Sequence, residues 1–278
     1  MKASKRLSAL RKLRFFLDRS TLERIYFSYI LPILEYADVV WDSLPIVFIN
    51  KLESIHKESA RIVTGATKLV SIELLYKDTC WDTLAERRKK HKIIKLHNMV
   101  YNYTPSSLSN ILPRRNSEIH NMRTRQSNHL STIKTNTTFY KNSFLPSTVH
   151  IWNNLPTIIR ENPSVSVLKN YLDREKNKSP SYRSYGNRTA QIYHSRLRLQ
   201  CSSLKAHLFE KNISDDPFCT CGYIEDNFHY LFACEKYTNI REQYIWTLNY
   251  DLNTECLLWG NPDLTNNTTK RGNRISCS

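Results

Sequence analysis

The feature that most constrains this chain is a short run of three cysteines and one histidine near its C-terminal end. Cys219, Cys221, His229 and Cys234 follow the spacing C-x-C-x7-H-x4-C. Thiolate and imidazole groups at such intervals are typical of a tetrahedral zinc site. Gly222 follows the second cysteine, where a turn that aims two sulfur atoms at one ion favours a residue without a Cβ. The spacing therefore predicts one zinc site.

A zinc ion held by four protein ligands has no open coordination position, so we expect a structural site and not a catalytic one. Its binding free energy, about 10 to 16 kcal/mol in zinc-finger peptides, would then be largely folding free energy. One alternative is that the cysteines are ordinary buried thiols in a reducing compartment and that His229 is a hydrogen-bonded core residue. A zinc-dependent nuclease is another alternative, but it requires an open position at the metal.

The overall charge favours a polyanionic partner. The chain of 278 residues has 41 Lys and Arg against 25 Asp and Glu, which gives a formal net charge of +16. Its hydrophobic fraction of 40% is sufficient for folded cores. RNA and DNA are therefore the expected partners, and no small-molecule substrate is expected. The alternative is a basic surface that serves only solubility.

The chain shows no signal for secretion or membrane insertion. Residues 1–6 do not resemble a secretory apolar region, and no stretch of about eighteen apolar residues could span a bilayer. We therefore expect an intracellular protein, nuclear or cytoplasmic, with no membrane partner. In a reducing compartment, the seven cysteines favour a metal site over disulfides.

Apolar residues recur at helical spacing and predict a mainly α fold. Pro32 should kink one helix, Gly65 should end another, and Thr83 with Glu86 should cap a third. The composition divides the chain into a helical region, a basic irregular linker rich in Pro, Ser, Asn and Thr, a second helical region, the zinc module and a polar tail. The predicted bounds are 1–103, 104–142, 143–210, 211–248 and 249–278.

Basic residues in three regions are candidates for phosphate contact, with plain solvation as the alternative. One group is a run inside a predicted helix, where Arg88 and Lys92 can share an exposed face, as can Lys89 and Lys92. Tyr223, beside the Gly222 turn, is the candidate for stacking on a base. The basic candidates are Arg87, Arg88, Lys89, Lys90, Lys92, Arg114, Arg115, Arg123, Arg125, Arg188, Arg196 and Arg198.

No catalytic site is predicted. Tyr36-Ala-Asp38 invites comparison with the Tyr-x-Asp-Asp turn of reverse transcriptases, but Val39 and Val40 follow Asp38 and the surrounding pattern is helical. Asp38 and Asp42 are better explained as helix-end acids. The chain also lacks a Gly-rich phosphate loop, a Gly-x-Ser-x-Gly elbow and a His-Glu-x-x-His pair.

Several short motifs follow one another along most of residues 10–240. They are Tyr29-Ile-Leu-Pro-Ile-Leu-Glu-Tyr-Ala-Asp-Val-Val-Trp-Asp42, Lys51-Leu-Glu-Ser-Ile-His56, Ala60-Arg-Ile-Val-Thr-Gly65, Leu84-Ala-Glu-Arg-Arg88 with His91-Lys92, Trp152-Asn-Asn-Leu-Pro156, Gly186-Asn-Arg188, His194-Ser-Arg-Leu-Arg198, Cys201-Ser-Ser-Leu204 with His207-Leu208, and Cys219-Thr-Cys-Gly-Tyr-Ile-Glu-Asp226 with His229 and Cys234. In this order they resemble the region that follows the palm in reverse transcriptases of non-LTR (LINE-type) retrotransposons. The last motif is similar to the family's terminal zinc knuckle.

This resemblance implies a thumb-like helical bundle in residues 1–103, a basic connecting region and a zinc knuckle, all from an RNA-directed DNA polymerase. The family's fingers, palm, magnesium carboxylates and endonuclease would then lie outside this sequence, so the chain resembles a C-terminal fragment that does not polymerise DNA alone. An upstream polymerase core is an expected partner. The competing hypothesis, from another class, is a zinc-stapled helical module that recruits a protein.

Overall fold

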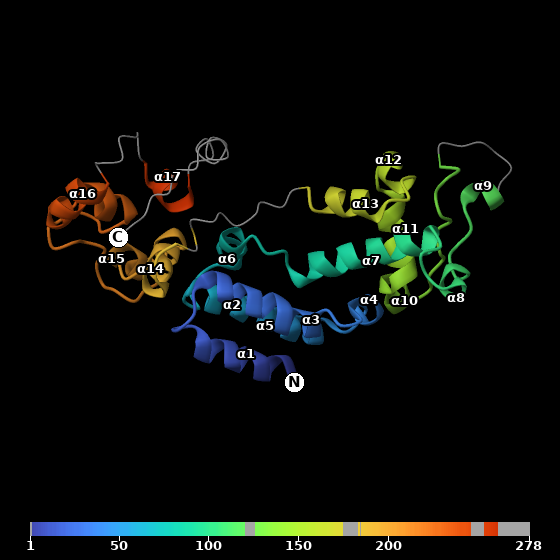
Figure 1. Cartoon of the computed structure of the whole chain (residues 1–278), viewed down its shortest axis with the longest axis horizontal. Helices are drawn as coiled ribbons and strands as arrows, with labels where there is room; N and C mark the ends of the chain where they lie inside the picture. The colour runs from blue at the N-terminus through green and yellow to red at the C-terminus, as the bar shows by residue number, and fades with distance from the viewer. Residues whose placement is uncertain (1, 120–125, 175–182, 184, 246–252, 261–278) are drawn as a thin grey trace. The chain divides into compact units, whose positions relative to one another are not determined.

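The computed structural model describes the chain except residues 1, 120–125, 175–182, 184, 246–252 and 261–278 (Figure 1). The described residues are mainly helical. Among them, β-structure is limited to two isolated antiparallel bridges, Arg115 with Leu130 and Phe218 with Ile224. The predicted mainly α fold is therefore confirmed. No helix in the described part combines the length and the apolar character needed to cross a membrane.

The chain packs as two units, and each is assembled from separate segments. The first unit contains residues 1–9, 25–58 and 80–178, and the second contains residues 10–24, 59–79 and 179–278. This division differs from the five contiguous regions expected from composition, because composition reports local character and not which segments pack together. Three helices cross the boundaries between segments: α1 (Lys2–Leu13), α2 (Arg19–Ile25) and α5 (Ile46–Thr64).

In the first unit, α11 and α13 pack against the long helix α7 (Figure 1). The buried cluster at this junction includes Ile93 and Leu96 of α7, Trp152 of α11 and Leu168 of α13. The helical elements of this unit are η1 (Tyr26–Ile30), α3 (Leu31–Leu34), α4 (Asp38–Trp41), α7 (Leu84–Val100), α8 (Ser106–Ser109), α9 (Asn116–Ile119), α10 (Thr138–Asn142), α11 (Phe144–Asn153), α12 (Thr157–Arg160) and α13 (Val165–Leu172).

The segment predicted as a linker contributes to this core. Leu130 is only 5% exposed and belongs to the buried cluster, and Leu112 packs against it. The Asn153 side chain accepts a hydrogen bond from the Leu130 backbone N–H at 3.1 Å and donates to its carbonyl at 2.8 Å. Leu112 and Leu130 are isolated leucines in a polar segment and show no helical spacing. Their burial therefore could not be predicted from periodicity or composition.

The predicted helix boundaries can be compared with the structure at three positions. Thr83 caps α7, since its side chain accepts from the Glu86 backbone while the Glu86 side chain accepts from the Thr83 backbone. At Pro32 the chain does not continue as one regular helix: the turn of π-helix η1 separates α2 from α3, which begins just before the proline. Gly65 ends α5 with a φ of 75°.

The second unit contains α14 and several shorter helices. The short helix α17 packs on α14, with Leu258 buried and the His194 Nε2 atom 3.2 Å from the Leu257 carbonyl oxygen. Part of the predicted polar tail is thus packed helix. The helical elements are α6 (Ile72–Thr79), α14 (Arg188–Arg198), α15 (Lys205–Phe209), the π-helical turn η3 (His229–Ala233), the 3-10 turn η4 (Glu235–Tyr237), α16 (Thr238–Tyr244) and α17 (Thr254–Trp259).

One buried carboxylate connects three segments of this unit. Asp78 at the end of α6 is 0% exposed, and its two carboxylate oxygens accept from Arg19 Nη1 and from Arg198 Nε, each at 2.8 Å. Arg183 lies 4.0 Å from the same carboxylate and also donates to the Asp78 carbonyl oxygen. Burial by itself would raise the pKa of Asp78, but the three guanidinium groups outweigh it and lower that pKa.

Two further arginines of α14 satisfy the carbonyl groups at the end of α5. Arg188 donates to the carbonyl oxygens of Ile62 and Val63, both at 2.8 Å, and Arg196 donates to that of Gly65 at 3.0 Å. The last carbonyl groups of a helix have no partner inside it, and they carry the negative end of its dipole. These arginines therefore have a structural role at the end of α5.

We predict that Asp78→Asn lowers the free energy of unfolding by about 3 to 5 kcal/mol, because three buried guanidinium groups lose their anionic partner. Urea denaturation followed by circular dichroism measures this loss. Since the folded-state pKa of Asp78 is lowered, its stabilisation is present above the ordinary value of 3.8 and is lost as pH falls below it. The difference between the two proteins should therefore shrink in acid.

The exposed Asp215 provides the matched control, and Asp215→Asn should leave the urea midpoint unchanged. An Asp78→Asn protein as stable as the wild type at neutral pH would contradict the structural role given to this carboxylate.

Candidate metal centre

The first two cysteines lie on a tight hairpin. Phe218 and Ile224 form the bridge across it, the Cys219 N–H donates to the Tyr223 carbonyl at 2.7 Å, and the Gly222 N–H donates to the Cys219 carbonyl at 2.9 Å. Gly222 has a φ of 89°, a backbone angle that favours glycine. A Cβ at this position would meet no atom within 4 Å, so the turn requires glycine for its backbone angle and not for space.

The other two residues flank one turn of π-helix: His229 begins η3 and Cys234 directly follows it. Asp226 precedes this turn, and its Oδ1 atom accepts from the His229 N–H at 2.7 Å. The turn η3 then ends at Cys234, whose N–H donates to the His229 carbonyl at 2.7 Å. The π-helical turn thereby connects His229 and Cys234, the third and fourth predicted ligands.

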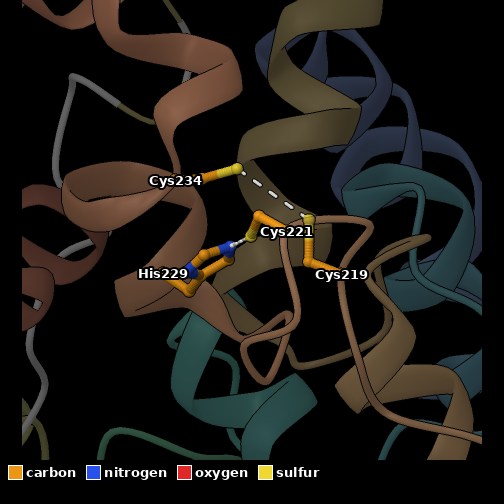
Figure 2. A group of neighbouring side chains, drawn as sticks. All are labelled: Cys219, Cys221, His229 and Cys234. Carbon is orange, nitrogen blue, oxygen red and sulfur yellow. Dashed lines mark hydrogen bonds between the residues drawn. The ribbon is translucent and has the colours of Figure 1, made fainter.

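All four predicted ligands converge (Figure 2). Their sulfur and nitrogen atoms lie within 4.8 Å of one another. The Cys219 and Cys234 sulfur atoms are 3.8 Å apart, and the Cys221 sulfur is 3.1 Å from His229 Nε2. Cys221 is exposed and the other three residues are buried. This cluster could hold a metal ion.

Electrostatics favours the ligand form of one thiol. The Cys221 backbone N–H, followed by the His229 side chain, lowers the pKa of Cys219 to about 6. Burial raises the pKa of Cys234. Since metals bind the thiolate, the Cys219 sulfur is prepared for coordination, whereas the Cys234 thiol must lose its proton when an ion arrives.

The metal loop has almost no core of its own. Among the described residues from 211 to 245, the buried ones are Cys219, His229, Cys234 and Arg241. Three of these four residues are the predicted ligands, and none is an aliphatic or aromatic hydrocarbon side chain. Burial in this segment is therefore concentrated at the metal cluster.

Two polar side chains connect the loop to neighbouring helices of the second unit. The Glu225 carboxylate accepts from the Lys205 N–H at 3.0 Å, at the start of α15. The Asn227 Nδ2 atom donates to the Leu197 carbonyl at 3.1 Å, near the end of α14. The carboxylate and amide side chains of the loop are thus bonded to the backbone of helices α14 and α15.

Aromatic side chains near the cluster are largely exposed. Tyr223 is 71% exposed, and its ring centroid lies 6.0 Å from that of His229. Phe218 and Phe228 are also exposed, whereas Tyr230 packs edge-on against Tyr237 at 5.0 Å. Most of the Tyr223 side chain is therefore exposed to solvent, and its stacking on a base stays a prediction.

Most of the basic run in α7 is paired with carboxylates. Both Arg87 and Arg88 have acidic partners, with Arg88 Nε 2.7 Å from Asp42. Lys90 lies 2.9 Å from an oxygen of Asp82 and 2.8 Å from one of Asp173. Lys92 is buried, pairs with Asp42 and donates to Ser147. Arg88 is buried as well, so the expected exposed face of Arg88 and Lys92 was wrong, because both side chains turn to the carboxylate of Asp42. Lys89, by contrast, is exposed and has no partner among the described residues.

The remaining basic candidates fall into three groups. Arg188, Arg196 and Arg198 have the carbonyl and carboxylate partners given above, and Arg198 is buried. Arg114 is exposed and Arg115 half-buried. Arg123 and Arg125 lie outside the described residues. Phosphate contact by any of these residues stays a prediction.

The two aspartates of the Tyr36-Ala-Asp38 region lie at the ends of a helical turn. Asp38 begins α4, and its carboxylate is 2.6 Å from His91 Nδ1. Asp42 follows the last residue of α4 and pairs with Arg88. The hydrogen bond that the Asp38 carboxylate accepts is the largest effect on His91 and raises the pKa of its imidazole. Both carboxylates are thus helix-end acids with cationic or imidazole partners.

Two important residues were not found from the sequence. Asp78 gave no signal, because its partners come from segments far apart in the chain. Arg241 is buried seven residues beyond the last predicted ligand, Cys234, and donates to its carbonyl oxygen. An arginine seven residues after a ligand is too common in sequences to indicate a contact with the metal site. Only the structure shows that contact.

No protein-family model, no curated protein and no solved structure matches this chain. The resemblance to LINE-type reverse transcriptases therefore depends on its ordered sequence motifs.

We predict that Cys234→Ser abolishes binding of one divalent ion per chain, because it removes a buried ligand from a four-ligand set. Titration with Co²⁺, followed by its thiolate charge-transfer absorption, measures the loss. Cys256→Ser is the matched control, since the half-buried Cys256 lies outside the cluster. Retention of stoichiometric binding by Cys234→Ser would exclude this set of ligands.

Proposed function

We propose that this chain is a zinc-stapled helical module that binds nucleic acid. The observation that carries the proposal is the four-ligand cluster, next to an exposed tyrosine, in a chain with a net charge of +16. A rigid loop that presents an aromatic ring within a positively charged protein suits a partner that has both bases and phosphates.

Zinc is the ion that best fits the donors. Three sulfur atoms and one imidazole nitrogen are soft to borderline ligands, which favour zinc over magnesium or calcium. Cys219, Cys221, His229 and Cys234 would hold the ion, and the chemistry it supplies there is structural. Its charge would stabilise thiolates inside a segment that buries almost nothing else.

For phosphate contact, the solvent-facing cations are better candidates than the paired ones. Lys89 and Arg114 are exposed, so a phosphate can reach them without breaking an existing ion pair. Arg88, Lys92 and Arg198 are buried, and moving them would leave Asp42 or Asp78 uncompensated. We therefore propose that the second group supports the fold and the first contacts the polyanion.

The proposed parentage follows from the sequence motifs. The order of the motifs from Tyr29 to Glu225 is the reason to relate this chain to the part of a LINE-type reverse transcriptase that follows the palm. In that setting it would hold RNA or DNA for a polymerase core and would carry no catalytic carboxylates of its own.

A specific observation favours one alternative, a protein-interaction module. In the first unit, Val40 is 80% exposed, and Ile46, Val47 and Phe48 at the start of α5 are each more than half exposed. Exposed apolar side chains close together in sequence are often covered by a protein partner. A protein that bound no RNA or DNA in dilute buffer would favour this alternative.

We predict that Lys89→Ala and Arg114→Ala each weaken binding of a fluorescein-labelled single-stranded RNA, and that each lowers the slope of log affinity against log salt by about 1. Fluorescence anisotropy at a series of NaCl concentrations provides this slope. Lys68→Ala, which removes an exposed charge elsewhere, is the control. Equal losses in all three variants would indicate diffuse attraction without local contacts, and an affinity independent of salt would refute the proposal.

We also predict that Tyr223→Ala weakens binding of the same RNA by about 1 to 3 kcal/mol, because a base loses its stacking surface. Tyr223→Phe keeps the ring and should bind like the wild type. Both variants should retain one metal ion per chain, since the exposed ring is not a ligand. If Tyr223→Ala bound RNA unchanged, base stacking at this residue would be excluded.

A further inference from the structure

Arg241 is a buried cation that contacts the backbone of a predicted metal ligand. It lies on α16 and is 3% exposed. Its Nη2 atom donates to the Cys234 carbonyl oxygen and lies 3.2 Å from Thr238 Oγ1. Its Nε and Nη1 atoms have no hydrogen-bond partner, and no carboxylate pairs with it, among the described residues. A guanidinium in such a position is costly unless an anionic group compensates it.

The metal cluster can provide this compensation. Three thiolates and one neutral imidazole around a divalent ion have a net charge of −1, and the surrounding segment buries no other charged group besides Arg241. The hydrogen bond to Cys234 keeps the guanidinium next to this centre. Without the loaded cluster, the Arg241 guanidinium has no anionic partner, and without Arg241 the negative charge of the cluster has no buried cation beside it.

We infer that Arg241 is a positioning residue of the metal centre, which fixes the backbone of Cys234 and balances the negative charge of the loaded thiolate cluster. This inference depends on the proposed zinc site. Groups outside the ligand set commonly change metal affinity by about 10- to 100-fold when they are removed. Arginine suits this role because it remains charged when buried and can donate to a carbonyl group at the same time.

The test compares three substitutions in the full chain. Arg241→Lys keeps the positive charge and a donor, Arg241→Gln keeps only donors, and Arg241→Met keeps neither. Zinc affinity is measured by competition with a chromophoric chelator, and the Co²⁺ absorption spectrum reports the ligand set. Circular dichroism of the metal-free proteins reports whether α16 and its neighbours still fold. The control is Lys236→Gln, an exposed charge that solvent screens, two residues after Cys234.

We expect Arg241→Gln and Arg241→Met to lose about 10- to 100-fold in zinc affinity with an unchanged ligand set, whereas Arg241→Lys recovers most of the affinity and Lys236→Gln has little effect. If Arg241→Met does not fold, the comparison of Arg241→Lys with Arg241→Gln decides. Equal affinity of the folded Gln and Lys variants and the wild type would overturn the inference. A wild-type chain that binds no zinc would instead overturn the proposed zinc site.

Discussion

The second unit depends on compensation of buried charge around Asp78. The carboxylate is removed from water, and without partners its charge would carry a large desolvation cost. Arg19 and Arg198, 59 and 120 residues away in the sequence, provide direct hydrogen bonds. These bonds join α2, α6 and α14, so one acidic residue determines how three distant segments meet. The planar guanidinium makes this arrangement feasible, because it can bond the carboxylate, a carbonyl group and a serine hydroxyl together.

The chain has more basic than acidic residues, partly because several arginines are bonded to backbone carbonyl groups and not to carboxylates. Arg188 and Arg196 bond the last carbonyls of α5, and Arg241 bonds that of Cys234. Helix ends offer partial negative charge, which stabilises a cation without any carboxylate. Burial, and then the neighbouring cation Arg19, lowers the pKa of Arg188 to about 10, so it still carries its charge at neutral pH. A net charge of +16 therefore overstates how many cations are available to phosphate.

The features predicted correctly from the sequence are those set by local chemistry. The mainly α fold, the capping pair of Thr83 and Glu86, the end of α5 at Gly65 and the convergence of four ligands all depend on residues close together in the chain. The two-unit packing was not predicted, since it pairs segments far apart. The α7 run illustrates the limit: its charge was evident from the sequence, but its acidic partners are Glu35, Asp42, Asp82 and Asp173, which lie elsewhere in the chain.

The metal loop shows why ligand spacing can be more informative than hydrophobicity. A segment of this size normally folds by burying apolar side chains, yet its described rings at Phe218, Tyr223 and Phe228 face solvent. Among the described residues from 211 to 245, only three of the four ligands and Arg241 are buried, so packing provides little free energy of folding. An ion bound by four side chains can replace a missing core, because its binding free energy is realised only when the ligands meet. Under the proposed function, the exposed rings would then be available to a partner, and the ion would support recognition without taking part in chemistry.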